Sequence, residues 1–263
     1  MLTNGTTGLA AEEIAALPKL AFVSALGVGF ENIAVEPARA RGIVLVNGAG
    51  TNDDCVADHA MALLLATVRR VPLHDRLCRA GVWRDALPMV PSVAGKRLGV
   101  FGLGAIGRKI ARRAQGFEMP VGYHNRSKRD DLAFEWFASL EALAAWCDVL
   151  VVATPGGPAT KHRVDAAVLE ALGADGYLVN IARGSVVDTA ALAAALAAGR
   201  LAGAGLDVYE SEPAPPAELL GFDNVVLTPH IGGRSPESMA ASLACFLDNA
   251  NRFLAGRPVA TPI

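Results

Sequence analysis

Short apolar runs alternate along this chain with segments in which apolar residues recur every three or four positions. The runs have the length of strands and are rich in bulky and β-branched residues, which fit a pleated surface. They occupy residues 20–24, 43–46, 98–101, 119–124, 149–153, 177–181, 204–208 and 225–227. Helical spacing covers residues 106–115, 140–145, 165–172, 189–198 and 236–254. Apolar strands separated by helices predict an α/β fold, with a parallel sheet that helices cover on both faces.

One long helix is expected over about residues 53–79, before this alternation becomes regular. Thr51 or Asn52 can cap its first turn, and Val56, Ala60 and Leu64 lie along one apolar face. Its length favours a role in packing or in a dimer. The segment that follows, residues 81–96, contains prolines and is expected to be irregular.

Composition narrows the class of protein. Of the 263 residues, 52% are hydrophobic and 19% charged, which excludes a disordered or fibrous chain. Lys and Arg (24) nearly balance Asp and Glu (26), so no charge footprint indicates nucleic acid or an anionic membrane as a partner. No apolar run approaches the ~20 residues of a membrane helix, and no basic-then-apolar segment opens the chain. The 4 cysteines are scattered, so we expect reduced thiols, no metal site and a cytoplasmic location.

A glycine-rich turn links the strand predicted at residues 98–101 to the following helix. Gly102, Gly104 and Gly107 form the pattern G-x-G-x-x-G, which is informative because a strand precedes it and a helix follows it. The first glycine permits a tight turn, the second lets the backbone approach a pyrophosphate, and the third lets helix and strand pack closely. Because a helix N-terminus favours negative charge, a dinucleotide site is expected here.

The residues after the next strand predict which dinucleotide binds. An NAD site usually has Asp or Glu about 20 residues after the glycines, bonded to the ribose 2′-hydroxyl. Here the matching residues are Asn125, Arg126 and Ser127, with no carboxylate among them. A guanidinium and a hydroxyl suit a 2′-phosphate. We therefore expect NADP(H) to be preferred, with NAD(H) as a second option.

Polar side chains also follow the later strands. Arg183, Asp207, Glu212 and His230 come after the runs at residues 177–181, 204–208 and 225–227. Ligands of open α/β sheets bind beyond the carboxyl ends of the strands. Arg183 can hold a substrate carboxylate and carbonyl oxygen, and His230 can give a proton to that oxygen. Glu212, if close, would raise the pKa of His230.

Taken in order, these motifs resemble the D-isomer-specific 2-hydroxyacid dehydrogenase family, and within it the NADP-dependent hydroxyphenylpyruvate and glyoxylate/hydroxypyruvate reductases. The resemblance covers essentially the whole chain. It implies a Rossmann doubly wound sheet with a second, smaller flavodoxin-like domain. It also implies an oxidoreductase that transfers hydride between NADP(H) and a small 2-oxo acid or D-2-hydroxy acid. The stretches that carry it are Gly102-Leu103-Gly104-Ala105-Ile106-Gly107, Asn180-Ile181-Ala182-Arg183-Gly184, Leu206-Asp207-Val208-Tyr209-Glu210-Ser211-Glu212-Pro213 and Thr228-Pro229-His230-Ile231-Gly232-Gly233.

The resemblance assigns roles to individual residues. Arg183, Glu212 and His230 are the expected catalytic residues. Substrate binding is expected from Arg183 and His230, and from the backbone N–H groups of Val28 and Gly29, where glycines let an anion approach. Asp207 is expected at the nicotinamide carboxamide. The expected cofactor-binding residues are Gly102, Gly104, Ala105, Ile106, Gly107, Asn125, Arg126, Ser127, Ala153, Thr154, Pro155, Ile181, Ala182, Arg183, Asp207, His230 and Gly232.

The same resemblance predicts how the chain is divided. Residues 1–49 are expected to form part of a substrate domain, residues 50–236 the NAD(P)-binding domain, and residues 237–263 a helix and tail that return to the substrate domain. Family members extend beyond the point that matches Met1, so the substrate domain is expected to be truncated. In the family, the region around Trp83 lies at a dimer interface, and a homodimer is therefore expected.

Two non-catalytic alternatives stay open. Corepressors of the C-terminal-binding-protein type resemble this family and bind partners in a dinucleotide-dependent way. They carry NAD-type carboxylates where this chain has Asn125 and Arg126. The other alternative is an inactive fragment that binds the cofactor without turnover, which would follow from a truncated substrate domain.

Overall fold

The computed structural model describes all 263 residues, and the chain divides into two compact units. The larger unit is Val56–Gly232, and the smaller unit joins Met1–Cys55 to Gly233–Ile263. The boundaries expected at residues 50 and 236 lie close to these. No helix is both long and apolar enough to traverse a lipid bilayer.

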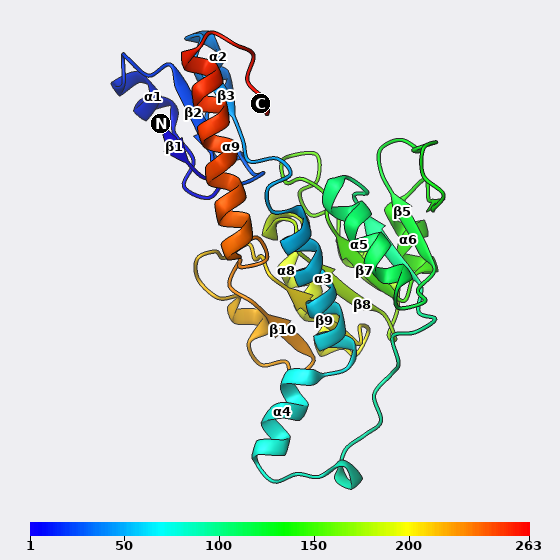
Figure 1. Cartoon of the computed structure of the whole chain (residues 1–263). Helices are drawn as coiled ribbons and strands as arrows, with labels where there is room; N and C mark the ends of the chain where they lie inside the picture. The colour runs from blue at the N-terminus through cyan, green and yellow to red at the C-terminus, as the bar shows by residue number, and fades with distance from the viewer. The chain divides into compact units, whose positions relative to one another are not determined.

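The larger unit is built on a seven-stranded parallel sheet (Figure 1). Its strand order is β10-β9-β8-β7-β4-β5-β6, so the direction of winding reverses between β4 and β7. This is the Rossmann type of doubly wound sheet, in which ligands bind beside the reversal point. The strands are β4 (Leu98–Phe101), β5 (Val121–His124), β6 (Glu135–Trp136), β7 (Val149–Val152), β8 (Tyr177–Asn180), β9 (Gly203–Leu206) and β10 (Val225–Leu227).

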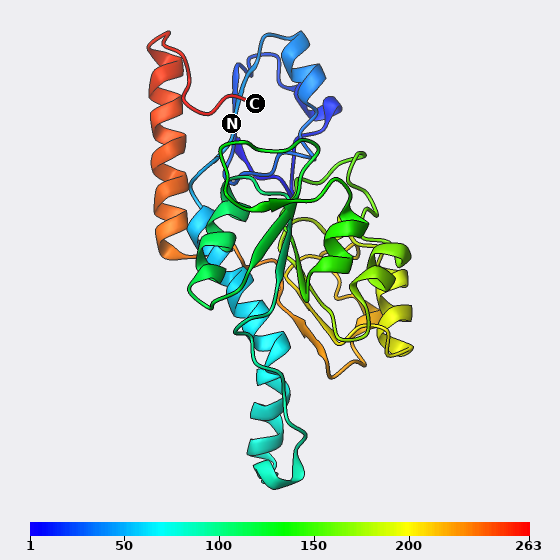
Figure 2. The same ribbon diagram turned by 90° about the vertical axis from the view of Figure 1, so that its right-hand side faces the viewer.

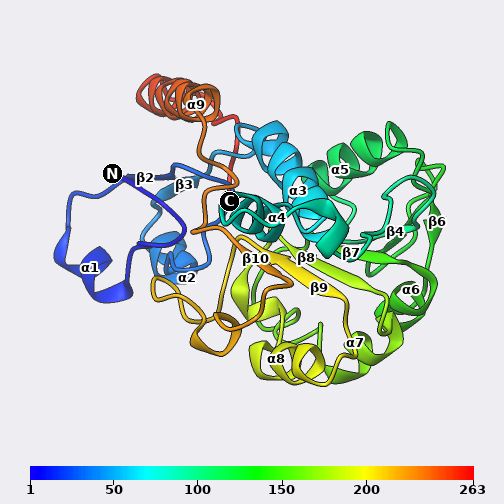
Figure 3. The same cartoon turned by 90° about the horizontal axis from the view of Figure 1, so that it is seen from below.

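Helices cover both faces of this sheet, as predicted (Figure 3). The alternation along β7 shows why an uninterrupted apolar strand is required: Val149 and Val151 pack on one face, and Leu150 and Val152 on the other. One face carries α3 (Asp53–Val68), whose residues from Val56 belong to the larger unit, and α5 (Ala105–Gln115). The opposite face carries α6 (Leu140–Trp146), α7 (Ala166–Leu172) and α8 (Thr189–Ala197).

The prediction of one continuous helix over residues 53–79 is wrong. The chain breaks after α3, where Arg70 has a left-handed φ of 49°, and restarts as α4 (Val71–Arg79) with Pro72 in its first turn. Proline is a start signal at that position because its missing N–H is not needed there. None of the residues of α4 is buried, and the helix projects away from the sheet of its own unit (Figure 2). We call α4 and residues 80–96 the arm.

The smaller unit has a three-stranded parallel sheet in the order β1-β2-β3, formed by Leu2–Thr3, Phe22–Ala25 and Val44–Val46. The helix α9 (Pro236–Leu254) packs on β2, where the Phe22 ring lies 5.2 Å from the ring of Phe253. Asn249 is fully buried and its side chain binds the backbone of the C-terminal tail. The remaining helices of this unit are α1 (Ala11–Ala16) and α2 (Val35–Ala40).

Candidate active site

The parallel strands of the larger unit place the predicted polar residues at one edge of the sheet. Because β4, β5, β7, β8, β9 and β10 all run in the same direction, the loops that follow them leave from the same side. Those loops contain most of the residues singled out in the sequence. In the order of the chain, these loops begin at Gly102, Asn125, Ala153, Ile181, Asp207 and Thr228.

The geometry of the turn after β4 requires glycine at Gly102 and Gly107 and leaves open space at Gly104. Gly102 has a φ of 101°, and a Cβ built there would lie 2.6 Å from the backbone nitrogen of Thr154. A Cβ on Gly107 would lie 2.2 Å from the carbonyl oxygen of Gly102, so helix and strand pack as closely as predicted. A Cβ on Gly104, in contrast, would meet nothing within 4 Å, at the N-terminus of α5. This open approach to free helix N–H groups fits a pyrophosphate.

In the turn after β5, one polar side chain is hydrogen-bonded within the fold and others are exposed to solvent. The side-chain oxygen of Asn125 accepts a hydrogen bond from the backbone N–H of Leu103 at 2.7 Å, which ties this turn to the glycine turn. Arg126 and Ser127 are exposed beside it. Arg129 is engaged by both oxygens of Asp131 at 2.8 Å, and this hydrogen-bonded guanidinium lowers the pKa of Asp131. Arg126, Ser127 and Lys128 are therefore the exposed donors of this turn, and the predicted contact of Arg126 and Ser127 with a 2′-phosphate stays a prediction.

Arg183 lies on the loop after β8, which hydrogen bonds within the loop hold in place. The side chain of Asn180 donates to the carbonyl oxygen of Arg183 at 3.1 Å and accepts from the backbone N–H of Ala182 at 3.0 Å. A Cβ on Gly184 would lie 1.9 Å from the carbonyl carbon of Tyr209, so the loops after β8 and β9 pack against each other. The guanidinium of Arg183 is half-buried and donates to the carbonyl oxygen of Ala182 at 2.6 Å.

Asp207 is buried, with 2% of its surface exposed, and its carboxylate organises the loop that carries His230. Burial alone would raise the pKa of Asp207, but hydrogen bonds lower it to about 2. One oxygen accepts from the hydroxyl of Thr228 at 2.6 Å and from the backbone N–H of Ile231 at 2.9 Å. The other accepts from the backbone N–H of Gly232 at 2.8 Å. The predicted contact of Asp207 with the nicotinamide stays a prediction.

His59 is a residue of this edge that the sequence reasoning missed. Its Nε2 lies 2.9 Å from the hydroxyl oxygen of Thr228 and 3.3 Å from a carboxylate oxygen of Asp207. Because the hydroxyl donates to Asp207, the ring nitrogen donates to the hydroxyl. His59 comes from α3, far away in the sequence, and no spacing signal connects it to this loop.

Glu212 and His230 form the ion pair that the sequence predicted. Nδ1 of His230 lies 2.8 Å from a carboxylate oxygen of Glu212, and the two side chains are 37% and 24% exposed. This hydrogen bond raises the pKa of His230, although burial and the nearby Arg183 charge oppose the rise. Burial alone would raise the pKa of Glu212, but His230 and the backbone N–H of Tyr209 lower it. With Nδ1 occupied, Nε2 is the ring nitrogen left for a substrate.

Val28 and Gly29 belong to the smaller unit. The carbonyl oxygen of Val28 accepts from the side-chain amide of Asn47, and that of Gly27 accepts from the N–H of Gly48, both at 2.8 Å. These bonds fix the loop through its carbonyl groups. The predicted role of the N–H groups of Val28 and Gly29 in substrate binding stays a prediction.

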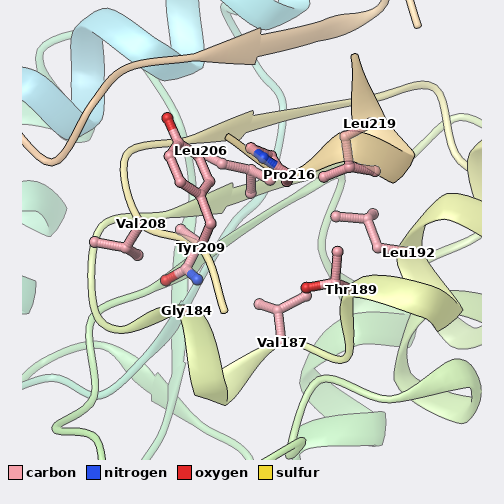
Figure 4. Close-up of a pocket in the computed structure, with 10 residues that line it drawn as sticks. Gly184, Val187, Thr189, Leu192, Leu206, Val208, Tyr209, Pro216 and Leu219 are labelled. Carbon is pink, nitrogen blue, oxygen red and sulfur yellow. The ribbon is translucent and has the colours of Figure 1, made fainter. Parts of the chain in front are cut away.

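Two other features bear on what the larger unit can bind. No group of three or more His, Cys, Asp or Glu side chains is placed to hold a metal ion. A cavity of about 10 Å³ lies under the loops after β8 and β9, bordered by Gly184, Val187 and Tyr209 (Figure 4). It has room for about one water molecule, so it is no cofactor site.

Comparison with known proteins identifies relatives of the whole chain. The family model described as "D-isomer specific 2-hydroxyacid dehydrogenase, NAD binding domain" matches residues 61–232. Hydroxyphenylpyruvate reductase of Plectranthus scutellarioides is 40% identical over 261 residues, which are 99% of this chain and 83% of the relative. 2-Ketogluconate reductase of Gluconobacter oxydans is 40% identical over 262 residues, which are 99% of this chain and 84% of the relative.

A solved structure shows the same likeness in three dimensions. It is the NADPH-dependent glyoxylate/hydroxypyruvate reductase of Sinorhizobium meliloti, in complex with NADP and malonate. The alignment covers 100% of this chain and 82% of that chain, with a TM-score of 0.94 and 40% sequence identity.

Proposed function

The chain belongs to the D-isomer-specific 2-hydroxyacid dehydrogenase family, and on that premise we propose that it is an NADP(H)-dependent reductase of small 2-oxo acids. The observation that carries the proposal is the ion pair of Glu212 and His230 beside Arg183, at the sheet edge that also holds the glycine turn. The names of the relatives point to hydroxypyruvate, glyoxylate, hydroxyphenylpyruvate or ketogluconate as the type of substrate.

The bound nicotinamide would supply the hydride for the C2 carbonyl of the substrate. Arg183 binds the substrate carboxylate and carbonyl oxygen through its guanidinium fork. His230 gives the proton on Nε2 to the carbonyl oxygen, and Glu212 holds the ring in place through Nδ1. The reverse reaction uses the same groups, with His230 accepting the proton from the D-2-hydroxy acid.

The first test is an assay of the full 263-residue chain. We expect oxidation of NADPH with hydroxypyruvate, glyoxylate or 4-hydroxyphenylpyruvate, and slower oxidation of NADH. A non-catalytic dinucleotide sensor or an inactive fragment predicts a fluorescence change of NADPH on binding without turnover. That result with all three substrates would overturn the proposed reaction and leave the dinucleotide site standing.

Cofactor choice is proposed to rest on Arg126, with Ser127 beside it. Replacing Arg126 with Ala is expected to raise the KM for NADPH by about 10–100-fold, because a charge-assisted hydrogen bond to the 2′-phosphate is lost. The KM for NADH is expected to stay within about twofold. The matched control is Arg200→Ala, which removes an exposed arginine from the turn before β9, at the opposite edge of the sheet. An equal change for both cofactors would contradict the assignment.

The pH dependence of reduction follows from the Glu212–His230 pair. Reduction needs protonated His230, whose pKa is raised by Glu212, so kcat/KM is expected to be level at low pH and to fall as pH passes the raised value. Glu212→Gln removes that support and is expected to move the fall to lower pH. A pH profile of kcat/KM for NADPH-dependent reduction measures the shift. Glu218→Gln, an exposed glutamate in the same unit, is the control.

The division of labour and the assembly are also proposals. We assign dinucleotide binding to the larger unit, through the cofactor-binding residues predicted from the sequence, and substrate binding in part to the smaller unit.

The arm carries large exposed apolar side chains, with Trp83 67% and Met89 100% exposed, which is typical of an interaction surface. This supports a homodimer, and light scattering tests it by a mass of twice 27.2 kDa.

A cytoplasmic location is proposed from the thiols. All the cysteines are free, and one of them, Cys78, is exposed. Disulfide-free cysteines are the rule in reducing compartments. Fractionation of cells that express the chain, with a marker enzyme for each compartment, tests the proposal.

A further inference from the structure

Tyr209 contacts both loops that form the Glu212–His230 pair. Its backbone N–H donates to one carboxylate oxygen of Glu212 at 2.8 Å, and the other oxygen of Glu212 binds His230. Its phenol O–H donates to the carbonyl oxygen of Thr228, two residues before His230. The same carbonyl oxygen accepts the backbone N–H of His230 at 3.0 Å. Tyr209 therefore touches the carboxylate directly and the histidine through one shared acceptor.

His230 needs such support because its backbone is in an unfavourable region. Its φ is 52°, a left-handed conformation that costs free energy for a residue with a side chain. Backbone bonds from its N–H to the carbonyl oxygens of Asp207 (2.8 Å) and Thr228 (3.0 Å) hold that conformation. Any movement of the Thr228 carbonyl would change the direction in which the imidazole points.

We propose that Tyr209 is a positioning residue, whose N–H orients Glu212 and whose phenol holds the turn that carries His230. The inference rests on the proposed reductase function for its kinetic consequence, but the geometry of the pair does not depend on it. The backbone N–H would be present with any residue other than proline. The phenol is the contribution that is specific to tyrosine, and it can be removed alone.

The surroundings of Tyr209 keep the phenol in place as a donor. Burial, with the carboxylates of Asp207 and Glu212 nearby, raises the pKa of Tyr209 to about 12, so the proton stays on the oxygen at working pH. Gly184 packs against the backbone of Tyr209, and the phenol oxygen points away from Gly184 (Figure 4). The backbone of Tyr209 thus packs against the loop of Gly184, and its phenol oxygen binds the loop of Thr228. The charged groups that face His230 are Glu212, Arg183 and Asp207.

The test is Tyr209→Phe in the full chain, with Tyr177→Phe as the matched control. Tyr177 begins β8, at the opposite edge of the same sheet, so the control removes a phenol without touching the pair. In Tyr209→Phe we expect kcat for reduction to fall about tenfold and the KM for NADPH to change less than twofold. We also expect the alkaline fall of kcat/KM, and the pKa of His230 measured by NMR, to move to lower pH.

A merely structural role predicts a different pattern. In that case Tyr209→Phe lowers the melting temperature but leaves the pKa of His230 and the pH profile as in the parent chain, and the proposal is overturned. The NMR titration also separates this inference from the proposed function. If the parent chain shows no turnover, the reductase proposal fails, while a lowered pKa of His230 in Tyr209→Phe still supports the positioning role. An unchanged pKa overturns that role whatever the activity.

Discussion

Replacing His230 with Gln is expected to lower kcat for reduction of a 2-oxo acid by about 10²–10⁴-fold, the usual loss on removing a general acid. Gln keeps a polar side chain near Glu212 but has no proton to transfer at neutral pH. Cofactor binding should weaken far less than kcat falls, because the glycine turn and Arg126 lie on other loops of the sheet edge. Steady-state kinetics with NADPH, together with a fluorescence titration of NADPH, measure the two effects separately.

A second histidine variant controls for the loss of an imidazole as such. His74 lies on α4 in the arm and not in a loop of the carboxyl edge, so His74→Gln is expected to retain the parent kcat. If His230→Gln keeps the parent kcat, another group transfers the proton and the assignment of His230 as the acid is wrong.

Replacing Arg183 with Gln is expected to reduce kcat/KM for the 2-oxo acid on the order of 10²–10³-fold. The reason is that the substrate carboxylate would lose a charged, forked donor in a half-buried site. Arg183→Lys keeps the charge and loses the fork, and should therefore recover only part of the activity. Initial rates at several concentrations of the 2-oxo acid, with saturating NADPH, give kcat/KM for the parent chain and the variants and so measure the loss.

The pH profile gives Arg183 a second signature. The positive charge of Arg183 lowers the pKa of His230, so its removal should move the alkaline fall of kcat/KM to higher pH, opposite to the shift in Glu212→Gln. An alkaline fall that stays in place in Arg183→Gln would show that the guanidinium does not face His230 in the working enzyme. An unchanged kcat/KM would exclude Arg183 from substrate binding.

The sheet and its helices were predictable because their signals are local. An apolar run long enough to cross the sheet identifies β4 and β10 to the residue, at Leu98–Phe101 and Val225–Leu227. The glycine turn was equally predictable, since Gly102 and Gly107 meet steric or conformational demands that no other residue can satisfy. The short elements β1, β6, α1 and α2 were not predicted, because each is too brief to show the hydrophobic period of a strand or a helix.

The break between α3 and α4 shows where periodicity misleads. Apolar spacing continues across the junction, but Arg70 turns left-handed and Pro72 starts a new helix. Proline at the start of a helix and proline within one leave similar sequence patterns, and the apolar pattern alone does not separate them.

Residue identity and order were sufficient to predict the fold class, the glycine turn and the candidate set Arg183, Glu212 and His230, whose roles in binding and catalysis stay proposals. These follow from spacing along the chain and from the rule that parallel strands end at one edge. The hydrogen bonds that support these residues are seen only in the folded chain. His59 binds the hydroxyl of Thr228, Asp207 accepts from the turn that carries His230, and Tyr209 donates to the carbonyl oxygen of Thr228. Hydrogen bonds between residues far apart in sequence depend on where the backbone brings donors and acceptors together. No local pattern encodes that placement, so these contacts emerge only when the sheet and its loops are assembled.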